Sequence, residues 1–182
     1  MKAIPNILTI LRIVLIPLFC LLYLGGAVAL SFALFIFLLL TDFFDGWLAR
    51  KLSLQSAFGA FLDPVADKLL VMSALVCLIA DGAITGAWLI AAILILAREI
   101  WIPSLRGMVG YDSPLSAVDN LGKWKTATQM IAIALLLLSP LYPFLYIPAL
   151  WLLGVAAVLT LISAARYTWK AKDYLSREET AG

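Results

Sequence analysis

Charged residues are scarce in this sequence, and histidine is absent. Only 13% of its 182 residues are charged, whereas 64% are hydrophobic. A soluble domain of this length is nearer half apolar and about one quarter charged. The chain therefore has too little polar surface to face water, and we expect a membrane protein whose main solvent is lipid.

Cysteine is almost as rare as histidine. Cys20 and Cys77 both lie inside long apolar runs, and they lack the spacing of a metal site. We expect them to be small buried hydrophobic residues. The ligands of any metal ion are then expected to be oxygen atoms.

Six apolar stretches approach the length of about 20 residues that crosses the hydrocarbon core of a bilayer. Turn residues separate several of them, at Gly25-Gly26, Asp81-Gly82 and Pro140–Pro143. The pattern predicts an all-α membrane protein with six transmembrane helices in residues 1–169, followed at 170–182 by a short polar tail that is expected to be a solvated helix end with no catalytic role. The predicted spans are 7–24, 27–49, 60–80, 84–105, 124–139 and 145–167.

Basic residues indicate the orientation of these helices. With six spans, every lysine and arginine falls on one side of the membrane, and basic loops remain in the cytoplasm. Both termini are therefore expected in the cytoplasm, in a bacterial inner membrane. The basic residues are Lys2, Arg12, Arg50, Lys51, Lys68, Arg98, Arg106, Lys123, Lys125, Arg166, Lys170, Lys172 and Arg177.

Four aspartates lie in the second and third predicted helices, where a carboxylate facing lipid costs about 2.5–3.5 kcal/mol or more. Asp42 and Asp45 share one helix face with Gly46 and Ala49. On the next helix, Gly59, Asp63 and Asp67 are spaced at i, i+4 and i+8, so antiparallel packing would bring the two sets together. Pro64 should begin or kink the third helix, which locates the cluster at the cytoplasmic mouth.

Carboxylates without histidine or cysteine favour hard cations, and four of them can bridge two Mg²⁺ or Mn²⁺ ions. Pairs of such ions serve phosphoryl transfer. The same acids would also fit a salt-bridge network, in which they pair with nearby basic groups such as Arg50, Lys51 and Lys68. They would equally fit an ion-coupled transporter with a carboxylate cluster.

The spacing of these residues resembles the signature of the CDP-alcohol phosphatidyltransferase family, D-x2-D-G-x2-A-R-x8-G-x3-D-x3-D. All eight positions match, within 26 residues. Because no signature residue is missing, we do not expect a scaffold that has lost its catalytic activity. The eight residues are Asp42, Asp45, Gly46, Ala49, Arg50, Gly59, Asp63 and Asp67.

The resemblance implies a role for each residue. The four aspartates would bind two metal ions, and Asp67 would also be the general base that deprotonates the acceptor alcohol. Gly46, Ala49 and Gly59 would leave room for the nucleotide of CDP-diacylglycerol, and Arg50 would contact its phosphates. Asn6, Thr9 and Arg12 are weaker candidates for the nucleotide, and the family implies a homodimer and no nucleic acid partner.

Other stretches resemble the phosphatidylglycerophosphate synthase branch of the family, whose acceptor is glycerol 3-phosphate. They are residues 5–9 with Arg12, and residues 58–68, 97–100 and 121–126. A phosphorylated acceptor needs further cations, and the candidates are Arg98, Arg106, Lys123 and Lys125. Each of the four is also explained as an ordinary cytoplasmic charge, although Arg98 and Glu99 lie deep in an apolar run, as site residues do.

Two positions differ from that branch. Gly107 stands where a larger or acidic residue is expected, and Asp119-Asn120 stands where a neutral pair is expected. Both are near the predicted acceptor site, so inositol phosphate or another phosphorylated alcohol remains an alternative acceptor.

Overall fold

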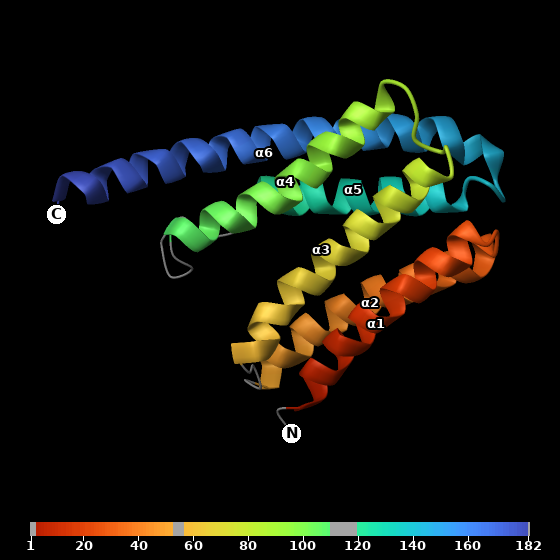
Figure 1. The fold of residues 1–182 in the computed structure, drawn as a ribbon, viewed down its shortest axis with the longest axis horizontal. Helices are drawn as coiled ribbons and strands as arrows, with labels where there is room; N and C mark the ends of the chain where they lie inside the picture. The colour runs from red at the N-terminus through yellow and green to blue at the C-terminus, as the bar shows by residue number, and fades with distance from the viewer. Residues whose placement is uncertain (1–2, 53–56, 110–119, 182) are drawn as a thin grey trace. The chain divides into compact units, whose positions relative to one another are not determined.

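A computed structural model shows a protein built from α-helices. It describes the backbone of residues 3–52, 57–109 and 120–181, and the side chains of residues 9–41, 62, 64–109, 122 and 124–176. Within these ranges there are six α-helices, one 3₁₀ helix and no β-strand (Figure 1). The helices are α1 (Ala3–Leu24), α2 (Val28–Leu52), α3 (Ala57–Ala80), α4 (Trp88–Val109), α5 (Asn120–Leu138), η2 (Pro143–Leu145) and α6 (Tyr146–Ala181).

The turns between helices form where the sequence predicted them. Gly26 follows α1 and Gly82 follows α3. Their φ values are 81° and 79°, a left-handed backbone conformation that residues with a side chain rarely adopt. Between α5 and α6, the chain turns through η2, which begins at Pro143. The all-helical fold and its six helices are therefore confirmed.

Several helix boundaries differ from the prediction. The helix predicted from residue 84 begins only at Trp88, because Gly86 (φ 56°) belongs to the preceding turn. The third helix begins at Ala57 and not at the predicted residue 60, and Pro64 lies inside it, which was one of the two alternatives predicted for this proline. The tail, predicted as a helix end, is helical, since α6 continues through residues 170–181.

The chain divides into two compact units. The first comprises Met1–Ala83 and Ile133–Tyr146, and its core is formed where α1 packs against α2 and α3. Phe19 and Phe35 are fully buried, with ring centroids 5.7 Å apart. At the far end of α1, the Tyr23 hydroxyl donates a hydrogen bond of 3.1 Å to Asp81, which ties this helix to the end of α3.

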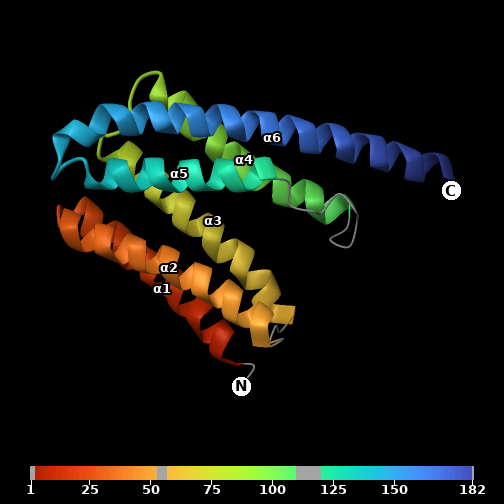
Figure 2. The ribbon, with the colours of Figure 1, turned by 180° about the vertical axis from the view of Figure 1, so that it is seen from behind.

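The second unit comprises Ile84–Ala132 and Ile147–Gly182. Here α4 and α6 run in the same direction, since Trp88 contacts Trp151 edge to face, and Trp101 Nε1 donates to Thr168 Oγ1 over 3.1 Å. Buried residues recur every three or four positions on α4, so one stripe faces the interior. Figure 2 shows α4 and α6 from the opposite side.

Many large apolar side chains face outward on both units. Leu21, Phe144 and Trp151 are 71%, 74% and 66% exposed. By length and composition, α4 and the segment Pro143–Ser176 are able to cross a membrane, whereas Thr9–Leu24, Val28–Thr41 and Trp124–Leu138 are shorter apolar runs. An apolar outer surface of this kind is expected of a protein solvated by lipid.

Gly154 allows α6 to pack closely against Trp88. A Cβ atom added there would lie 3.0 Å from the Trp88 ring. We predict that Gly154→Leu lowers the free energy of unfolding by about 1–3 kcal/mol, because overpacking forces the ring to move. Thermal unfolding of the purified protein in detergent measures the change.

Gly107 provides the matched control on α4. A Cβ atom there meets nothing within 4 Å, so Gly107→Ala should raise stability by about 0.5–1 kcal/mol through helix propensity. Equal melting temperatures for Gly154→Leu and the wild-type protein would contradict the close packing of α6 against Trp88.

Candidate active site

The signature residues divide between two neighbouring helix ends of the first unit. Asp42, Asp45, Gly46, Ala49 and Arg50 lie in the last turns of α2, and Gly59, Asp63 and Asp67 lie in the first turns of α3. Leu52 and Ala57 are five residues apart, so the two ends are separated by at most about 18 Å. Figure 1 shows these ends together, beside the beginning of α1.

The backbone is helical at all these positions, as the prediction of acids and small residues on one face of each helix requires. Of the signature side chains, only Asp67 lies within the part of the structure that is described, and it is partly buried. The side chains of Asp42, Asp45, Gly46, Ala49, Arg50, Gly59 and Asp63 lie outside the described residues. Among the described side chains, no three acids or cysteines lie close enough to share a metal ion.

The first turns of α1 contribute two buried polar residues to the same unit. Thr9 and Arg12 are 0% and 1% exposed, and their spacing of three puts them on one helix face. Burial of a guanidinium is costly unless its charge is balanced. The sequence made both residues weak candidates for binding the nucleotide, and that role stays a prediction.

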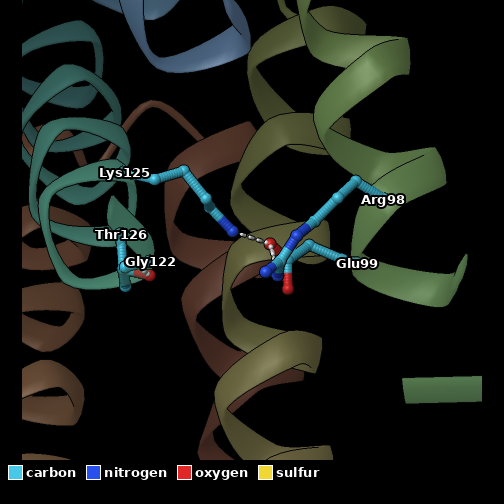
Figure 3. A network of polar contacts seen from close by, with 5 residues as sticks. All are labelled: Arg98, Glu99, Gly122, Lys125 and Thr126. Atoms are coloured by element: carbon cyan, nitrogen blue, oxygen red, sulfur yellow. Dashed lines mark hydrogen bonds and ion pairs between the residues drawn. The ribbon is translucent and has the colours of Figure 1, made fainter. Parts of the chain in front are cut away.

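A buried ionic cluster connects α4 and α5 in the second unit (Figure 3). Glu99 Oε1 accepts hydrogen bonds from Lys125 Nζ at 2.5 Å and from Arg98 Nη1 at 3.2 Å. The side chains of Lys125 and Glu99 are 2% and 5% exposed, whereas that of Arg98 is 15% exposed. Two of the four predicted acceptor-binding cations are thus brought together by a carboxylate.

Arg106 lies two turns beyond this cluster on α4. Its guanidinium carbon is 5.3 Å from the centre of the Tyr167 ring, a cation–π contact with α6. Arg106 is seven residues from Glu99, so both occupy the same stripe of α4. The side chain of Lys123, the fourth predicted cation, lies outside the described residues.

Several buried polar atoms of the second unit lack a hydrogen-bond partner within the described part of the chain. They are Arg98 Nε, Arg106 Nε, Gln129 Oε1 and Thr160 Oγ1. An unsatisfied buried polar group costs about 1–3 kcal/mol, so each of these atoms is expected to meet a polar ligand or an ordered water. Two arginine donors among them suit an anion.

Glu99, Gln129 and Tyr167 were not predicted as site residues. An acid inside an apolar run was a usable signal for Glu99. Gln129 lies one turn beyond Lys125 on the buried face of α5 and is 1% exposed. The only sign of this residue in the sequence was its spacing of four from a lysine. Nothing in the sequence indicated that Tyr167 would contact Arg106.

Comparison with known proteins gives the same family as the signature. The family model for CDP-alcohol phosphatidyltransferase matches residues 2–165. A CDP-diacylglycerol–glycerol-3-phosphate 3-phosphatidyltransferase from Haemophilus influenzae is 41% identical over 178 residues, which are 94% of this chain and 95% of that protein.

Two further relatives show the range of the family. An enzyme of the same name from Cereibacter sphaeroides is 44% identical over 75% of this chain and 64% of its own length. A cardiolipin synthase (CMP-forming) from Oryza sativa subsp. japonica is 39% identical over 95% of this chain and 56% of its own length. With a family model that matches nearly all of its helices, the chain belongs to the CDP-alcohol phosphatidyltransferase family.

Proposed function

We propose that the protein transfers the phosphatidyl group of CDP-diacylglycerol to glycerol 3-phosphate, producing phosphatidylglycerophosphate and CMP. The observation that carries the proposal is the complete family signature at the neighbouring ends of α2 and α3. Relatives named for this reaction, at 41% and 44% identity, support glycerol 3-phosphate as the acceptor.

Asp42, Asp45, Asp63 and Asp67 are proposed to hold two divalent ions. Their donor set is oxygen alone, as Mg²⁺ and Mn²⁺ prefer, and the continuous helices α2 and α3 repeat them at spacings of three and four residues. When bound, these ions would stabilise the negative charge that develops on the phosphoryl oxygens during displacement.

Asp67 is proposed as the general base. Its carboxylate would take the proton from the acceptor hydroxyl, whose oxygen then forms a bond to the phosphorus attached to diacylglycerol. The bond from this phosphorus to the bridging oxygen breaks, and CMP leaves. Arg50 would bind the nucleotide phosphates, while Gly46, Ala49 and Gly59 would let the nucleotide approach the helix backbones.

Arg98, Arg106, Lys123 and Lys125 are proposed to bind the phosphate of the acceptor. This role is supported by the Nε atoms of Arg98 and Arg106, which have no hydrogen-bond partner among the described residues, and by the buried Lys125 ammonium. A phosphate monoester carries up to two negative charges, which suits a site rich in cations. The same cations would also accept inositol phosphate, whereas an acceptor without a phosphate monoester would gain less from them.

We further propose that all six helices cross the membrane, with both termini and the active site on the cytoplasmic side. The uncharged turns after α1 and α5 and the basic residues at the opposite helix ends support this topology. With 36 residues, α6 is about 54 Å long, so its basic end would extend beyond a hydrocarbon core of about 30 Å.

Asp67→Asn tests the general base. We predict a fall in kcat of about 10²–10⁴-fold, because the amide cannot accept the hydroxyl proton. CMP release by purified protein measures it. Asp81→Asn is the matched control: Asp81 is exposed and lies at the opposite end of α3, so this variant should keep wild-type turnover. Near-normal turnover of Asp67→Asn would show that another group is the base.

Chelation tests the metal requirement. We predict that EDTA abolishes CMP release and that added Mg²⁺ or Mn²⁺ restores it, because carboxylates hold these ions reversibly. Asp42→Asn should stay inactive at metal concentrations that saturate the wild-type enzyme. Full activity of the wild-type protein in EDTA would refute the role of the four aspartates as ligands.

The acceptor is tested by supplying CDP-diacylglycerol with one alcohol at a time. CMP release is expected with glycerol 3-phosphate, and none is expected with free glycerol, because the cationic cluster then has no phosphate to bind. Inositol phosphate tests the alternative phosphorylated acceptor. Phosphatidylglycerol tests the reaction for which the Oryza relative is named, and release with that lipid alone would replace the present proposal.

A further inference from the structure

Glu99 is the centre of the cluster between α4 and α5, although it was not predicted as a site residue. A single oxygen, Oε1, accepts from both Lys125 and Arg98 (Figure 3). These partners differ in sequence position, since Arg98 is the neighbouring residue and Lys125 is 26 positions away. The carboxylate therefore determines where two cations from different helices lie relative to one another.

Stability alone is a poor explanation for this arrangement. Removing an ammonium and a carboxylate from water costs several kcal/mol for each ion, and a well-packed apolar pair often holds two helices as firmly. Apolar residues occupy several other positions of the same stripes, such as Ile95 and Ile102 on α4 and Ala132 on α5. A charged group on this stripe is more readily explained by what it binds or orients.

The charges and the donors of the cluster suit an anion. Glu99 carries one negative charge, and Arg98 and Lys125 carry two positive charges, so the three groups sum to +1. Arg98 reaches Glu99 through Nη1, and its Nε has no hydrogen-bond partner among the described residues. An anion beside the cluster would gain this donor, which belongs to a cationic side chain.

We propose that Glu99 is a positioning residue for the phosphate of the acceptor alcohol. It holds the guanidinium of Arg98 and the ammonium of Lys125 in one place, so that both meet the phosphate without first having to be ordered. Lysine and arginine side chains lose about 2 kcal/mol of rotamer entropy when fixed, and a carboxylate that fixes them beforehand lowers this cost of binding. The inference rests on the function proposed above.

Glu99→Gln removes the charge and keeps the shape of the side chain. We expect the KM for glycerol 3-phosphate to rise about tenfold to a hundredfold, the loss that corresponds to one charged hydrogen bond. The KM for CDP-diacylglycerol should change less than about twofold, because its proposed ligands lie in the first unit. An equal rise in both constants, or no change in the first, would overturn the positioning role.

A binding measurement that needs no turnover makes the test independent of the reaction. Inorganic phosphate should raise the melting temperature of the wild-type protein in detergent, since a ligand of the folded state stabilises it. In Glu99→Gln this increase should be smaller at every phosphate concentration. No increase in the wild-type protein would overturn the proposal that the cluster binds phosphate.

Tyr23→Phe is the matched control for lost stability. It removes another hydrogen bond between distant parts of the chain, the one to Asp81, from the first unit. Its melting temperature should fall, whereas its response to phosphate and its KM for glycerol 3-phosphate should remain those of the wild-type protein. A phosphate response that falls equally in Tyr23→Phe and Glu99→Gln would reduce Glu99 to a structural contact.

The double variant Glu99→Gln with Lys125→Met separates positioning from a simple link between α4 and α5. Replacing both residues removes the Lys125 charge that Glu99→Gln alone leaves uncompensated, whereas Arg98 keeps its charge, so the melting temperature should recover in part. The KM for glycerol 3-phosphate should stay high, and its recovery would contradict the proposal.

If the wild-type protein releases no CMP with glycerol 3-phosphate, the proposed function fails, and the phosphate response of Glu99→Gln still decides the role of Glu99.

Discussion

The cost of burying charge constrains every other feature of this protein. An ionised side chain removed from water loses several kcal/mol unless an opposite charge or a ligand compensates it. In a chain that is 64% hydrophobic, the buried Arg12, Glu99 and Lys125 therefore need compensating groups nearby. The second unit meets this need by joining Glu99 to Arg98 and Lys125.

The short connection between α2 and α3 holds their acidic ends near one another. Because only four residues separate α2 from α3, the acids near the end of one helix and the start of the next are confined to the same end of the first unit. α1 packs against both helices and carries Thr9 and Arg12 in its first turns. The backbone thus brings these positions of the sequence to one end of the unit, where the proposed substrate would compensate their charges.

Local patterns predicted the helices well and their ends less well. Apolar runs and glycines in turns are local signals, so the six helices and the turn at Gly82 could be read directly. The sequence indicated that a polar helix end follows the last apolar run, because residues 170–181 are rich in Ala, Lys, Arg and Glu, which favour helix without needing burial. It overestimated α4, because the apolar residue Ile84 is buried in a turn.

The sequence by itself determined the family, the helical class and the eight signature positions, since each depends on residue identity and spacing along one chain. Only the tertiary structure decided that Lys125 meets Glu99 and that Arg106 lies over Tyr167. Those contacts join residues 26 and 61 positions apart. They depend on how each helix is rotated about its axis, which packing sets and spacing does not.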